Sequence, residues 1–144
     1  MMKTCGDVMT ADPVCCLGTD TVDKVAQMMR SEDVGPMPVV DNFQTRKLVG
    51  IVTDRDLAIK VVADSRDSRM TRVQDVMTRK VATCHPGDDL QKALDTMASN
   101  QVRRIPVVDN NDMIVGIISQ ADIATRQENA AKTGAVVEEI SKPA

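Results

Sequence analysis

The sequence predicts an α/β (α+β) fold made of two copies of one strand–helix–strand–strand–helix unit. Three observations support this prediction: a pattern that occurs twice, short β-branched runs that end in turn residues, and apolar residues at helical spacing. Residues 7–58 recur in pattern as residues 75–124. Two copies of one supersecondary unit imply a domain with a pseudo-two-fold axis and related clefts where the copies meet.

Three short motifs make the repeat visible. Asp7-Val8-Met9-Thr10 returns as Asp75-Val76-Met77-Thr78, and Met37-Pro38-Val39-Val40 returns as Ile105-Pro106-Val107-Val108. The third motif ends each copy's last strand and is described below. The loop that follows the Pro-containing strand is two residues longer in the first copy.

The first copy contains every element of the unit in order. The apolar run 14–17 predicts a strand, and the Gly-Thr-Asp sequence after it signals a turn and a helix start. The helix follows from Val22, Val25, Ala26 and Met29, which have the spacing of one buried helical face. The remaining elements are a strand over 37–40, a polar hairpin loop over 41–47, a strand over 48–52 and a helix over 54–62.

The second copy repeats this order. Its predicted elements are strands over 81–84, 105–108 and 114–118, a helix carrying Leu90, Ala93, Leu94 and Met97, and a final helix from Ile123. We therefore divide the chain into repeat 1 (1–63), an exposed polar linker (64–74), repeat 2 (75–127) and a C-terminal tail (128–144). Val136, Val137 and Ile140 predict that the tail is a short amphipathic helix.

Composition limits the classes of function. The net charge of −3 argues against generic electrostatic binding to nucleic acid or to an anionic membrane. No apolar run approaches the roughly 20 residues needed to cross a bilayer, and the first ten residues lack the apolar segment of a secretory signal. We expect a cytoplasmic protein.

The core is expected to be aliphatic. Phe43 is the only aromatic residue, so Val, Ile, Leu, Ala and the ten methionines must fill the interior. The four cysteines, Cys5, Cys15, Cys16 and Cys84, and the single histidine, His85, have no zinc-site spacing, so no metal is predicted. Cys16 and Cys84, at matching repeat positions, are expected to close equivalent strands.

Both final strands end in one chemical pattern: glycine, two β-branched residues, a hydroxyl residue, two variable residues and aspartate. The hydroxyl residues are Thr53 and Ser119, and the aspartates are Asp56 and Asp122. Each hydroxyl residue is predicted to stand where a strand leads into a helix, a place suited to a phosphate, and each aspartate can accept two hydrogen bonds from a ribose diol. The alternative is a capping box, in which both side chains only satisfy the start of the helix.

In these motifs, and over residues 7–127, the chain resembles the CBS-domain family, as a stand-alone tandem protein. The resemblance implies a Bateman module with two central clefts that bind adenine nucleotides or derivatives such as AMP, ADP, ATP, NAD or S-adenosylmethionine. It also implies ribose and phosphate binding by Thr53, Asp56, Ser119 and Asp122, and assembly into a homodimer. The module would act on a regulated protein that the sequence does not identify.

The resemblance suggests further contacts. Arg103 and Arg104 precede the Pro-containing strand of repeat 2 where repeat 1 has Gly35 and Pro36, so these arginines, with Arg55, are phosphate candidates. A solvated basic patch is the alternative. The candidates for the adenine pocket, each equally plausible as a core residue, are Val14, Cys16, Met37, Ala82, Cys84 and Ile105.

No enzyme is predicted, because a nucleophile, a base and an orienting group cannot be assembled with one histidine. The sequence also has no Gly-rich phosphate loop and no metal cluster, and no catalytic cofactor is expected. The leading interpretation is a regulatory sensor with an adenine nucleotide as its ligand. The alternatives are a ligand-free dimeric interaction module and, ranked last, a thiol sensor that uses Cys15 and Cys16.

Overall fold

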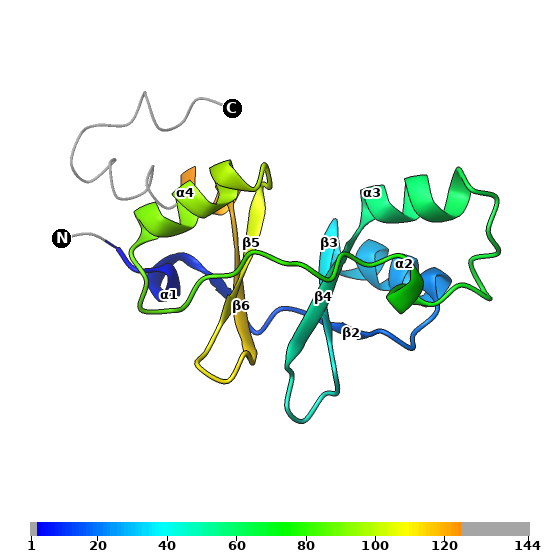
Figure 1. Cartoon of the computed structure of the whole chain (residues 1–144), viewed down its shortest axis with the longest axis horizontal. Helices are drawn as coiled ribbons and strands as arrows, with labels where there is room; N and C mark the ends of the chain where they lie inside the picture. Colours follow the sequence, from blue (N-terminus) through cyan, green and yellow to red (C-terminus); the bar gives the residue numbers. More distant parts are fainter. Residues whose placement is uncertain (1–2, 125–144) are drawn as a thin grey trace. The chain divides into compact units, whose positions relative to one another are not determined.

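The computed structural model describes residues 3–124 of the chain, so the predicted tail 128–144 and the end of repeat 2 lie outside the described residues. Figure 1 shows the elements and labels most of them. They are α1 (Cys5–Val8), β1 (Thr10–Ala11), β2 (Cys16–Leu17), α2 (Val22–Glu32), β3 (Pro36–Val40), β4 (Leu48–Thr53), α3 (Asp54–Leu57), the π-helical segment η1 (Ala58–Val62), the 3-10 segment η2 (Val73–Asp75), α4 (Leu90–Ser99), β5 (Arg104–Val108) and β6 (Ile114–Ser119). A further helix begins at Gln120.

The chain forms two compact units. Of the described residues, unit 1 contains 3–11, 82–109 and 115–124, and unit 2 contains 12–81 and 110–114. Each unit has its own three-stranded sheet, which gives the mixed α/β fold that the sequence predicts.

Unit 2 is built on the sheet β2-β3-β4. β2 pairs in parallel with β3, and β3 pairs antiparallel with β4, with a register shift between Val39 and Val40. The helix α2 buries Val22, Val25 and Met29, three of the four positions predicted for its apolar face. These side chains join Met37, Val39 and Val52 in one aliphatic core.

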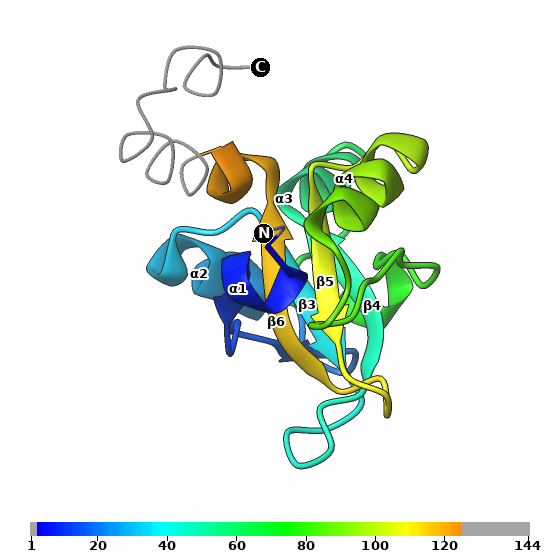
Figure 2. The same cartoon turned by 90° about the vertical axis from the view of Figure 1, so that its left-hand side faces the viewer.

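Unit 1 is built on the sheet β1-β6-β5, whose last two strands are seen side by side in Figure 2. Its core combines α1, α4 and both long strands, and contains Cys5, Val8, Cys84, Leu90, Ala93, Met97, Ile105, Val107, Ile118 and Ile123. Cys84 bridges Val107 in parallel, as Cys16 pairs with Val39 in unit 2. The prediction that these two cysteines occupy equivalent strand positions is confirmed.

The units do not follow the linear order of the repeats. The first repeated motif of repeat 1 belongs to unit 1, where β1 pairs antiparallel with β6. The corresponding motif of repeat 2 belongs to unit 2, where Thr78 pairs with Ile51 of β4. Each sheet is thus completed by a segment from the other repeat.

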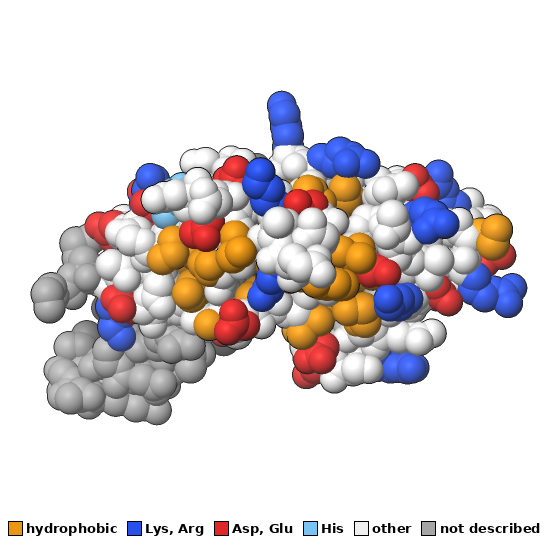
Figure 3. All heavy atoms as spheres, turned by 90° about the horizontal axis from the view of Figure 1, so that it is seen from below, with side chains coloured by type: hydrophobic (Ala, Val, Ile, Leu, Met, Phe, Trp, Pro, Cys, Tyr) orange, Lys and Arg blue, Asp and Glu red, His pale blue; other side chains and the backbone are white. Residues whose placement is uncertain are grey.

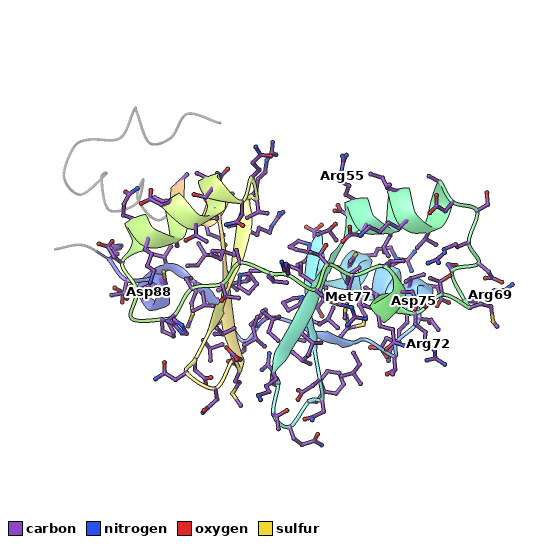
Figure 4. All side chains as sticks on the ribbon, in the orientation of Figure 1. Arg55, Arg69, Arg72, Asp75, Met77 and Asp88 are labelled. Carbon is purple, nitrogen blue, oxygen red and sulfur yellow. The ribbon has the colours of Figure 1, made fainter. Side chains whose placement is uncertain are left out.

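A glycine makes room for each of these segments. A Cβ atom placed on Gly116 would lie 2.3 Å from Met9 Sδ, and one placed on Gly50 would lie 2.8 Å from both Met77 Sδ and Thr78 O. Met77 is labelled beside β4 in Figure 4. The glycine in the pattern that ends each copy therefore serves close packing of the exchanged segment.

The predicted helices and strands are confirmed in position, with differences in extent. The helix predicted from Ile123 begins at Gln120. The segment 64–74, predicted to be exposed, ends in η2, where Val73 is fully buried in the core of unit 2 because it packs among aliphatic side chains. The first strands are shorter than predicted: β2 spans two residues in place of 14–17, and the predicted strand 81–84 is reduced to the single bridge at Cys84. β2 is short because it pairs only with the last two residues of β3. The predicted helix 54–62 begins as α3 and continues as a π-helix, in which the amide of Ala63 donates to Ala58 O at 2.9 Å.

Candidate functional site

Thr53 and Asp56 meet at the end of β4. The hydroxyl of Thr53 accepts a hydrogen bond from the amide of Asp56 at 3.1 Å, and the amide of Thr53 donates to Asp56 Oδ2 at 3.0 Å. This reciprocal pair is the capping box that the sequence left open as an alternative. Both residues are partly exposed, so the cap leaves them accessible to a ligand.

The second carboxylate oxygen of Asp56 faces a lysine. Lys60 Nζ lies 3.3 Å from Asp56 Oδ1, and the same ammonium group donates to the carbonyl of Val76 at 2.9 Å. Sequence reasoning missed Lys60. Its signal was the separation of four residues between an acid and a lysine on one predicted helix, the spacing of helical ion pairs.

The same corner recurs in unit 1. The hydroxyl of Ser119, at the end of β6, accepts a hydrogen bond from the amide of Asp122 at 2.9 Å. Ser119 and Asp122 are partly exposed, like their counterparts in unit 2. The structure therefore brings each predicted hydroxyl residue together with its aspartate.

The segment before each Pro-containing strand joins its corner through one backbone hydrogen bond. The amide of Asp54 donates to Gly35 O at 2.9 Å, and the amide of Gln120 donates to Arg103 O at 3.0 Å. These bonds place residue 35 beside the Thr53 corner and residue 103 beside the Ser119 corner.

The two corners differ in charge. A Cβ on Gly35 would lie 3.2 Å from a carboxylate oxygen of Asp54, so an acid occupies the place where the Ser119 corner has the neutral Gln120. Arg103 and Arg104 are exposed and form no ion pair with any residue from 3 to 124. Arg55 is also exposed and extends away from α3 in Figure 4.

The adenine candidates divide by burial. Val14 is 39% exposed and Ala82 is partly exposed. The other four are almost fully enclosed in the cores of their units: Cys16, Met37, Cys84 and Ile105. Side chains enclosed in this way pack the core, so Val14 and Ala82 are the candidates that can contact a ligand through their side chains.

The cysteines are buried thiols. All four are free, and burial raises the pKa of each: Cys5, Cys15, Cys16 and Cys84. Because the thiolate is the form that reacts with oxidants, this environment disfavours the thiol-sensor alternative. Among residues 3–124, no group of three or more His, Cys, Asp or Glu could hold a metal ion.

Cys16 gives a prediction for alkaline pH. Burial raises its thiol pKa from 9.0 to about 12 in the folded protein. As the pH rises, the thiol of the unfolded chain ionises before that of the folded protein. The free energy of unfolding that Cys16 contributes is therefore complete below pH 9, decreases above pH 9 and is gone once the pH passes 12. The decrease is at most about 1.4 kcal/mol per pH unit. Urea unfolding at pH 8 to 11 should show a smaller loss of stability in Cys16→Ala than in the parent, and equal losses would contradict the assignment.

The distribution of charge and the apolar character of the helices bear on possible partners. Acidic and basic side chains are interspersed on the face drawn in Figure 3, in line with the net charge of −3. Within the described part of the chain, no helix has the length and apolar character that crossing a membrane requires.

Comparison with known proteins identifies the family. The family model for the CBS domain matches residues 5–63 and 73–129. The CBS domain-containing protein YhcV of Bacillus subtilis is 34% identical over 140 residues, which cover 97% of this chain and 96% of that protein.

Solved structures agree with this assignment. The CBS domain pair of protein MJ0100, in complex with 5′-methylthioadenosine and S-adenosyl-L-methionine, has a TM-score of 0.80 and 25% identity, covering 90% of this chain and 99% of that one. CBSX2 in complex with AMP has a TM-score of 0.76 and 25% identity, covering 90% and 98%. From the two matched repeats and these near full-length likenesses, we conclude that the protein belongs to the CBS domain family and has the fold of a CBS domain pair.

Proposed function

We propose that this protein is a regulatory sensor that binds adenine nucleotides or derivatives at the corners formed by Thr53 with Asp56 and by Ser119 with Asp122. The observation that carries the proposal is the duplicated corner, in which an accessible aspartate follows a hydroxyl residue at the start of a helix. Two similar CBS pairs, named above, are described in complex with compounds that contain adenosine. Each aspartate would accept the two ribose hydroxyls.

The charge difference supports the proposal that phosphate binds at the Ser119 corner. Arg103 and Arg104 supply guanidinium groups that can form paired, charge-assisted bonds to phosphate oxygens. At the Thr53 corner the carboxylate of Asp54 beside Gly35 would repel a phosphate. The cations near this corner are Arg55 and Lys60, and Lys60 is already paired with Asp56. We therefore expect AMP, ADP or ATP to bind more tightly at the Ser119 corner, with Val14 and Ala82 contributing to the adenine pockets.

We also propose where the protein acts and in what assembly. The protein would act without catalysis and without a catalytic cofactor, in the cytoplasm, as a homodimer that adjusts the activity of a partner protein. Occupation of the corners would change the shape or association of the module, because a ligand shifts an equilibrium by its differential affinity for the two states.

A ligand-free interaction module is the second candidate function, and the capping box favours it. Thr53 and Asp56 satisfy each other and the helix start without any ligand. In that case both motifs serve stability alone.

Thermal unfolding separates the two functions. Against AMP, ADP, ATP, NAD and S-adenosylmethionine, a sensor should show a saturable rise in Tm of roughly 5–10 °C at 100 times the Kd. Asp56→Ala and Asp122→Ala should each remove the shift that belongs to its corner. The loss of a cap alone would cost about 1 kcal/mol with or without nucleotide.

Asp89→Ala is the matched control. Asp89 caps α4 by accepting a hydrogen bond from the amide of Gln91 at 3.0 Å, and it lies in neither corner. This variant should lose stability and keep the full nucleotide shift. If the parent protein shows no shift with any of the five compounds, the interaction module is the better description.

A further inference from the structure

The ammonium group of Lys60 joins two segments of unit 2 that are distant in sequence. It contacts Asp56 Oδ1 at 3.3 Å and the carbonyl of Val76 at 2.9 Å. The first contact lies in the Thr53 corner. The second lies in the exchanged segment 75–78, which comes from repeat 2.

The geometry of Asp56 leaves room for both Lys60 and a diol. Its Oδ2 accepts the amide of Thr53 and its Oδ1 faces Lys60, so each oxygen has one contact. A carboxylate has about four acceptor positions, two on each oxygen. One position on each oxygen remains for a ribose hydroxyl while Lys60 and Thr53 hold the carboxylate in place.

The exchanged segment is attached to the strand that carries the corner. The amides of Thr78 and Ile51 exchange hydrogen bonds with each other's carbonyls, each at 2.9 Å, and Met77 packs against Gly50. Val76 is buried in the core of unit 2. A change at the carboxylate can therefore reach this segment through Lys60 as well as along β4.

The π-helical turn defines the position of Lys60. Residues Ala58–Val62 form the π-helix, and Lys60 is its central residue. π-Helical turns within α-helices occur frequently at functional sites. Here the turn carries Lys60, whose side chain bonds to both the corner and the exchanged segment.

We propose that Lys60 is a positioning residue that orients Asp56 for the ribose diol and couples occupation of the Thr53 corner to segment 75–78. This rests on the proposed function for its ligand. The coupling is reciprocal: if the segment stabilises the arrangement that binds ribose, bound ribose stabilises the segment by the same factor.

Variants of Lys60 test the proposal, in an Asp122→Ala background so that only the Thr53 corner binds. The probes are AMP and 5′-methylthioadenosine, with Kd measured by calorimetry. Lys60→Met, which keeps the aliphatic stem, should weaken binding roughly fivefold. Lys60→Arg should restore most of the affinity.

Lys24→Met is the matched control. Lys24 pairs with Asp20 at 3.0 Å across the same four-residue spacing in unit 2, and it bonds to neither corner nor segment. This variant should bind both probes like the parent. Tighter binding in Lys60→Met would overturn the proposal, because it would mean that Lys60 competes with the ribose for Asp56.

Hydrogen exchange tests the coupling. Added probe should slow exchange of the Met77 and Thr78 amides in the parent and in Lys24→Met, and it should not do so in Lys60→Met. Equal protection in Lys60→Met would contradict coupling through Lys60.

The ligand-free protein separates this proposal from the proposed function. Without any probe, Lys60→Met and Asp56→Asn should each speed exchange of the Thr78 amide, and the double variant should be no faster than the faster single variant. If no probe binds the parent, the proposed function fails while this measurement still decides the coupling. Additive effects of the two substitutions would exclude it.

Discussion

Gly116→Ala and Gly50→Ala are expected to lower the free energy of unfolding by about 1–3 kcal/mol each, and Gly87→Ala is expected to leave it unchanged. At Gly116 the added methyl group would meet Met9 Sδ at 2.3 Å and Met9 Cγ at 2.8 Å. At Gly50 it would meet a backbone oxygen, Thr78 O, at 2.8 Å. At Gly87 nothing lies within 4 Å, so this variant controls for the change from glycine to alanine itself.

Chemical denaturation of the three variants measures these differences. A second substitution distinguishes the two crowded sites: Met9→Ala should recover part of the stability of Gly116→Ala, because it removes the atoms in conflict. Met77→Ala should recover less in Gly50→Ala, since the conflict with the Thr78 carbonyl remains. If Gly50→Ala and Gly116→Ala were as stable as Gly87→Ala, this result would contradict the conclusion that the exchanged segments pack closely against these two glycines.

Met37→Ala should destabilise the protein by about 2–5 kcal/mol, through lost burial and the cavity that remains. Met37 is fully buried in the core of unit 2, whereas Met70 is 78% exposed. Met70→Ala is therefore the matched control and should change stability by less than about 0.5 kcal/mol.

Met37→Leu refines this test. It keeps the volume of the side chain and should cost less than about 1.5 kcal/mol. Urea unfolding of the three variants gives the comparison. A small effect of Met37→Ala, close to that of Met70→Ala, would contradict the role of Met37 in the core and return it to the candidates for ligand contact.

The spacing of apolar residues and the β-branched runs predicted the helices and strands that depend on interactions between residues close in sequence. The helical spacing from Val22 to Met29 corresponds to α2, and the β-branched runs correspond to β3, β4, β5 and β6. The corners were predictable because a hydroxyl residue followed three positions later by an acid favours a helix start.

Long-range features were not predictable in the same way. The exchange of segments was hidden because both copies of the Asp-Val-Met-Thr motif are identical, so neither composition nor spacing indicates which sheet each one completes. The π-helical turn at Ala58–Val62 differs from an α-helix in its hydrogen-bond spacing, and its residues have no composition that distinguishes them from an α-helix. The burial of Cys16, Met37, Cys84 and Ile105 likewise depends on tertiary packing.

The exchange of segments has a consequence for a chain with a single repeat. Such a chain would leave the glycine on its last strand uncovered, because the methionine that packs there comes from the other repeat. It could obtain that methionine only from a second molecule, at a rate and with an occupancy that depend on protein concentration. Joining two repeats by a linker replaces this encounter with an effective concentration of the order of millimolar. Duplication thus makes the completion of each sheet independent of how much protein the cell contains.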